Sequence, residues 1–130
     1  MSLPAPWEDR GSAPVEFVLV GTLLTVLTLG VIQLALGVYV RNVAHDAAVE
    51  GAYHAALADT SLDDGADRTR AVIERAIGAD YANEVRVDEE EVRGHRMVVV
   101  TVRTPMPVIG LIGVPAAWEV TGRAPAESLD

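Results

Sequence analysis

The chain has 130 residues, of which 50% are hydrophobic, and its formal net charge at neutral pH is −9. It contains no cysteine, so neither a disulfide framework nor thiolate chemistry is available to it. From Arg41 onward nine arginines stand against sixteen acidic residues, and this net charge of −7 argues against nucleic acid or anionic lipid headgroups as partners.

In chain order, residues 1–11 form a short polar segment that we expect to be unstructured. A general secretory signal is not indicated, because the apolar run that follows is too long and no small-residue cleavage pattern comes after it. The polar segment ends in Gly11, and Ser12 begins the approach to the apolar run. Glu16 lies five residues after the glycine and directly before Phe17.

Residues 17–40, FVLVGTLLTVLTLGVIQLALGVYV, carry no charge. As an α-helix this stretch is about 36 Å long, against a hydrocarbon core of about 30 Å in a bilayer. Apolar residues occur all round the helix, so no face remains for water. We therefore predict a transmembrane span over 17–40; the alternative is a buried core helix, which a chain of this size has too little material to cover.

The polar leader that ends in Gly11, followed by an apolar helix with Glu16 at its edge, resembles the prepilin signal of type IV pilins and pseudopilins. The wider string from Gly11 to Phe17, GSAPVEF, is similar to that of TadE-like minor pilins of the tight-adherence (Flp) pilus system. Residues 39–52 and 105–121 also resemble that family. The resemblance implies that a prepilin peptidase cuts after Gly11, so that Ser12 begins the mature chain.

The chemistry of Glu16 agrees with this implication. A carboxylate beside a membrane span is costly to desolvate unless a cation meets it, and a cut before Ser12 creates an α-ammonium, on the same chain or on a neighbour. In the pilin interpretation Glu16 and Phe17 set the register of assembly. The alternative is that Glu16 lies solvated at the headgroup level and has no partner.

The first helix is expected to continue to about residue 58, because no glycine–proline pair interrupts it. Small residues recur along it and would let a helix or a sheet approach closely, unless alanine is merely frequent here. They are Ala44, Ala48, Gly51, Ala52 and Ala55. Asp46, Glu50 and His54 share another face, but three such ligands on one helix leave a metal incompletely coordinated. We expect a solvated stripe or an ion pair there, and no metal.

Residues 59–130 predict a small head. Ser61-x-x-Asp64 has the spacing of a capping box and begins a second helix that ends near Gly78. Alternation from Val85, a hairpin turn at 93–95, a strand over 97–104 that is apolar on both faces, and a strand over 117–123 predict a three-stranded antiparallel sheet with 97–104 at its centre. The apolar loop 106–114 either packs on the head, touches the membrane or meets a partner.

These elements predict an α+β protein with a leader (1–11), an N-terminal helix (12–58) that includes the span, and a head (59–130). No nucleophile with a base, paired carboxylates or phosphate-binding loop is present in the sequence, so no enzyme and no cofactor are expected. The resemblance implies a non-catalytic minor pilin whose partners are other pilin subunits, a prepilin peptidase, the assembly platform and the lipid bilayer. It also implies an inner-membrane location with the head outside the cytoplasm. The alternative function is a membrane-anchored binding module that never enters a filament.

Overall fold

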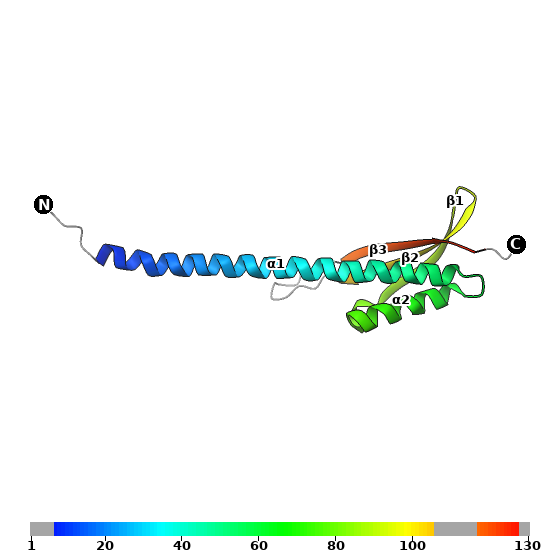
Figure 1. Cartoon of the computed structure of the whole chain (residues 1–130), viewed down its shortest axis with the longest axis horizontal. Helices are drawn as coiled ribbons and strands as arrows, with labels where there is room; N and C mark the ends of the chain where they lie inside the picture. The colour runs from blue at the N-terminus through cyan, green and yellow to red at the C-terminus, as the bar shows by residue number, and fades with distance from the viewer. Residues whose placement is uncertain (1–6, 106–116, 128–130) are drawn as a thin grey trace. The chain divides into compact units, whose positions relative to one another are not determined.

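The computed structural model describes residues 7–105 and 117–127, without the side chains of 7–10 and 117. Its elements are α1 (Trp7–Ala56), α2 (Leu62–Ala76), the 3₁₀ helix η1 (Ala79–Tyr81), β1 (Glu84–Val92), β2 (His95–Pro105) and β3 (Ala117–Pro125) (Figure 1). The sheet is antiparallel with the order β1-β2-β3. The predicted α+β class is confirmed: a long apolar N-terminal helix, one further helix and three antiparallel strands. The loop expected over 106–114 lies outside the described residues.

The chain divides into two compact units, Met1–Ala35 and Leu36–Asp130. The described part of the first unit consists of α1 residues alone. The expectation of an unstructured leader is wrong for residues 7–11, which are helical. Extending an existing helix by one residue is far easier than nucleating a new one, so the long apolar helix that follows carries this segment with it.

Pro14 lies inside α1. A proline has no backbone N–H, so the carbonyl of Arg10 lacks the hydrogen bond that the fourth residue along would normally donate, and the ring crowds that carbonyl. In a helix interior this costs about 3 kcal/mol. The start of α1, before Pro14, is therefore its weakest part.

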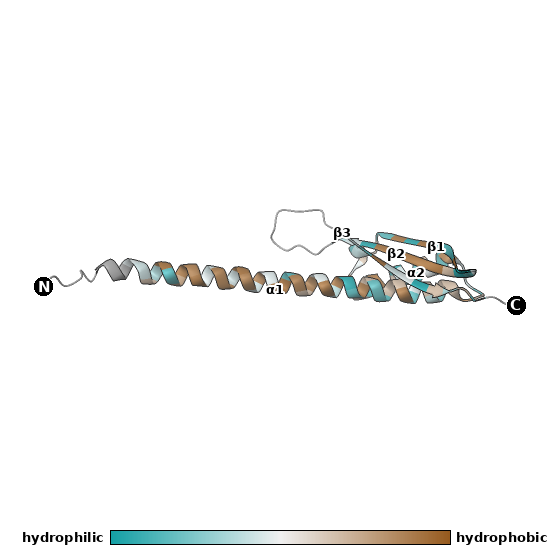
Figure 2. Ribbon diagram, turned by 90° about the horizontal axis from the view of Figure 1, so that it is seen from above, coloured by the Kyte–Doolittle hydropathy of each residue, from teal (hydrophilic) through white to brown (hydrophobic). Residues whose placement is uncertain are grey.

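The second unit, residues 36–130, is called the head from here on. It is larger than the head of 59–130 expected from the sequence, because it includes the last part of α1, from Leu36 to Ala56. Its core contains buried side chains from both helices and from the sheet: alanines of α1, Ile73 of α2, valines of β2, and Val120 and Ala124 of β3. Gly37 and Val40, at the end of the predicted span, are buried within this unit. In Figure 2 much of strand β2 has the colour of hydrophobic residues.

One face of the sheet packs on both helices. Register places Val87, Val100 and Gly122 in one row across the three strands, and Val100 is fully buried. Residues two apart along a strand share a face, so Val98 and Val102, which are also buried, lie on the core side with Val100. The prediction that strand 97–104 is central is confirmed, because β2 pairs with both other strands.

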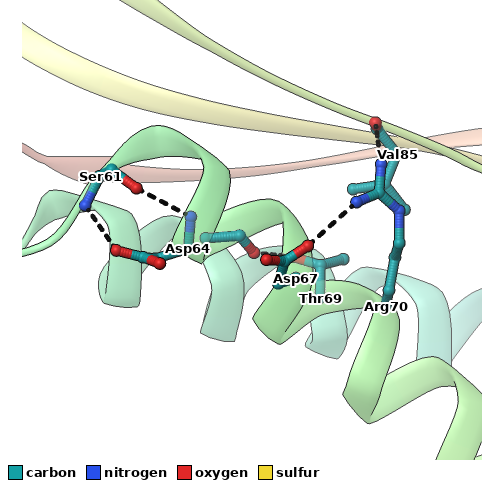
Figure 3. A network of polar contacts seen from close by, with 7 residues as sticks. Ser61, Asp64, Asp67, Thr69, Arg70 and Val85 are labelled. Atoms are coloured by element: carbon teal, nitrogen blue, oxygen red, sulfur yellow. Dashed lines mark hydrogen bonds and ion pairs between the residues drawn. The ribbon is translucent and has the colours of Figure 1, made fainter.

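Helix α2 begins at the predicted capping box (Figure 3). The Asp64 N–H donates to Ser61 Oγ at 3.1 Å, and the Ser61 N–H donates to Asp64 Oδ2 at 2.9 Å. The hydrogen bond from the Ser61 backbone, with a second from its hydroxyl, lowers the pKa of Asp64 below 3.8. The helix ends at Ala76, and Gly78, with φ of 107°, turns the chain into η1.

Candidate functional site

The residues of the expected processing site lie in the first unit, on α1. Gly11 has open space around it, since a Cβ built there meets nothing within 4 Å. Ser12 and Glu16 are four residues apart in the helix, and this spacing places them on the same face. Glu16 and Phe17 are exposed, Phe17 by 79%. A cut before Ser12 would therefore create an amine one helical turn from the Glu16 carboxylate of the same chain.

The apolar part of the first unit is exposed all round. Large apolar side chains that are more than half exposed recur on every side of the helix: Val15, Phe17, Val18, Leu19, Val20, Leu23, Leu24, Val26, Leu27, Leu29, Val31 and Leu34. The hydroxyls of Thr22 and Thr25 donate to helix carbonyls at 2.7 and 2.8 Å, so these polar groups are satisfied without water. In the part of the chain that the structure describes, α1 is the helix that is long and apolar enough to cross a membrane.

The small residues of α1 lie in the head, and the head itself covers them. Ala44, Ala48 and Ala52 are fully buried, and Gly51 and Ala55 are buried beside them. Two different elements use this surface. A Cβ on Gly51 would lie 2.8 Å from the carbonyl oxygen of Gly65 in α2, and one on Gly122 of β3 would lie 2.6 Å from the carbonyl oxygen of Ala48.

The polar stripe of α1 contains an ion pair with α2. The guanidinium of Arg68 in α2 donates to the Glu50 carboxylate, its Nε at 2.8 Å from Oε1. The Asp46 carboxylate lies 3.9 Å from Nδ1 of His45, at a well-exposed position. In the described part of the chain no group of three or more histidine and acidic side chains is placed to hold a metal ion.

The described residues of the head line two shallow hollows. One, of about 410 Å³, lies beside the end of α1 and is lined by Tyr53, His54 and Arg68 among others. The other, of about 520 Å³, lies over the polar face of the sheet, where Glu84, Arg103 and Glu119 form one cross-strand row. Both are open and contain charged pairs, and neither brings together a nucleophile and a base.

Comparison with known proteins gives one match. The model of the family described as TadE-like protein matches residues 11–52. The match covers about a third of the chain, and over this segment the chain is similar to TadE-like proteins. No curated protein and no solved structure gives a match. The TadE-like segment begins at Gly11 and contains Glu16, the exposed apolar helix and most of the small residues of α1.

The match confirms the family resemblance for residues 11–52 and is consistent with a pilus-associated protein. It ends before the head's second helix and sheet, so the likeness expected over 105–121 stays a prediction. Sequence reasoning missed Gly122, whose lack of a side chain lets β3 approach the backbone of α1. A glycine in the interior of a strand is the signal that was available, since it often marks such a close approach.

Proposed function

We propose that the chain is a non-catalytic minor pilin or pseudopilin of a tight-adherence (Flp) type pilus. In this role it is stored in the inner membrane with its head outside the cytoplasm, and it then joins a secreted filament or the base on which the filament assembles. One observation carries the proposal: the TadE-like segment begins with an apolar helix whose large side chains are exposed on every side. Lipid covers such a surface in the membrane, and neighbouring pilin helices cover it in a filament.

The exposed apolar helix accounts for storage of the subunit in the membrane. Glu16 would favour its transfer from the membrane into the assembled filament. Packing helix against helix replaces lipid contacts without much gain from the hydrophobic effect, because lipid tails are as apolar as leucine. A charged pair inside the packed helices adds a strong preference for one register. Glu16 and the α-ammonium of Ser12, on its own or a neighbouring chain, are the two partners of that pair.

Processing and assembly are tested together in cells that carry the pilus system. With an active prepilin peptidase the chain is expected to lose its first 11 residues and to begin at Ser12, as intact mass will show. Glu16→Gln is expected to be cut normally, because the cut depends on Gly11. Removing one partner of a buried charge pair costs about 3–5 kcal/mol, so incorporation of this variant should fall by more than about a hundredfold.

Asp46→Asn is the matched control, since it removes an exposed carboxylate from the same helix and should change neither measurement. A chain that keeps its leader in the presence of active peptidase contradicts the pilin assignment. Normal processing with normal assembly of Glu16→Gln would instead contradict only the pairing role. A membrane-anchored binding module, the alternative, predicts a chain absent from sheared filaments and filaments that form without it.

A further inference from the structure

The ring of Trp118, near the start of β3, lies against the backbone of α1. A Cβ built on Gly37 would be 2.8 Å from Cη2 of this indole and 3.6 Å from Cζ2 and Cζ3. Gly37 is buried by this contact, whereas Trp118 stays partly exposed. Both residues belong to the head unit, so their contact lies within the head.

This contact lies where the apolar stretch ends. Val38 and Tyr39, next to Gly37, are 47% and 52% exposed, and Arg41 is the first charged residue after the stretch. Tryptophan and tyrosine concentrate at membrane–water interfaces, where the ring meets the acyl chains and the polar atom meets water. An arginine beside them extends its guanidinium to the same level.

The acidic run of the sheet lies at the end away from Trp118. The two cross-strand pairs of β2 and β3 at this end, Pro105 with Ala117 and Thr104 with Trp118, carry no charge. The acidic run 88–91 of β1 pairs with the opposite end of β2, from Arg96 to Val99. At the Trp118 end only these outermost pairs are uncharged, because the next row holds Glu84, Arg103 and Glu119. The end of the sheet that carries Trp118 therefore has an uncharged edge, whereas the end with 88–91 carries four consecutive acidic residues that anionic headgroups repel.

We propose that Trp118 and Tyr39 hold the head directly on the phospholipid interface, with their rings at the boundary between headgroups and acyl chains. The length of the free apolar helix agrees: residues 17–35 span about 28 Å, close to the hydrocarbon thickness of about 30 Å. The last turn of the predicted span is then withdrawn from lipid on one side and covered by the head. This goes beyond the pilin role and needs only that the chain is anchored in a membrane.

The test uses the full chain in phosphatidylcholine liposomes. Trp7→Phe leaves Trp118 as the only tryptophan. We expect its fluorescence to be quenched by lipids that carry a nitroxide near the headgroup, less by lipids labelled at the end of the acyl chain, and little by iodide in the water.

The control moves the probe to the far end of the head. Tyr53→Trp, combined with Trp7→Phe and Trp118→Phe, places the only tryptophan at a position that is 60% exposed. It lies 14 residues beyond Tyr39 on α1, about 21 Å further along the helix. We expect iodide to quench it and neither nitroxide lipid to do so.

Iodide quenching of Trp118 without nitroxide quenching, in a chain that floats with the liposomes, would overturn the inference and leave membrane anchoring intact. Equal nitroxide quenching at both probe positions would overturn it as well, because the head would then lie flat on the surface. A chain that does not float with liposomes would contradict anchoring and this inference together.

Discussion

Gly51 lies where α1 and α2 cross, and Gly51→Ala tests how closely they approach. The added methyl would be 2.8 Å from the carbonyl oxygen of Gly65 and would overlap Oγ1 of Thr69. The Thr69 hydroxyl could move away by a change of rotamer. The Gly65 carbonyl belongs to the backbone of α2, so a rotamer change alone does not make room for the methyl. The two helices have to separate, and Ala55, which packs on Gly65, moves with them.

The magnitude follows from two opposed terms. Alanine is better than glycine in a helix interior by about 1 kcal/mol, which would stabilise the variant if the site were open. Overpacking a tight core costs typically about 1–3 kcal/mol, and the upper end applies here because backbone must move. We expect a net loss of about 2 kcal/mol, which lowers the unfolding temperature of a head of this size by roughly 10 °C.

Thermal unfolding of the full chain in detergent micelles, followed by tryptophan fluorescence, measures the effect. Gly21→Ala is the matched control, because a Cβ at this exposed helical glycine meets nothing within 4 Å. Thr69→Ala should recover part of the loss in the double variant, since it removes the overlapping hydroxyl but not the Gly65 carbonyl. A Gly51→Ala chain as stable as the parent, or more stable, would refute the close crossing.

Two further predictions concern single polar groups. Thr104 is fully buried, and its hydroxyl has no hydrogen-bond partner among the described residues, so Thr104→Val should stabilise the head by about 1 kcal/mol in the same unfolding assay. Thr69→Val, which removes a buried hydroxyl that donates to a carbonyl at 2.9 Å, should bring no such gain, and equal gains would contradict the reasoning. Because the folded-state pKa of Asp64 lies below 3.8, its capping box contributes stability above that pH and loses it as pH falls through the folded pKa. Asp64→Asn should therefore lose less stability than the parent on acidification below 3.8, and parallel pH profiles would count against the cap.

The sequence predicted the features that local patterns determine. The apolar run 17–40, the capping box at Ser61 and the alternation along β1 each follow from residues close together in the chain. The hairpin is of the same kind, since Arg93 and Gly94 both have the positive φ that its tight turn requires.

Contacts between distant segments were out of reach. The spacing of small residues showed that something approaches α1 closely, yet it could not show that α2 covers Gly51 while β3 covers Ala48. The same holds for Gly37 and Trp118, which are 81 positions apart in the sequence. From their apolar composition, residues 36–40 were predicted to be part of the span. The structure shows that the head buries one side of this segment.

Pro14 affects how stable the helix is around the peptide bond between Gly11 and Ser12. In the uncut chain Pro14 lies within α1 and weakens the helix on the N-terminal side of the proline. The Gly11–Ser12 bond is on that side, and a peptidase would need the backbone to open there. If the chain is cut there, Pro14 becomes the third residue, in a first turn whose N–H groups have no helical partners in any case. The defect of about 3 kcal/mol then disappears. One proline would thus ease the opening of the precursor helix and leave the mature helix intact up to its new end, beside Glu16.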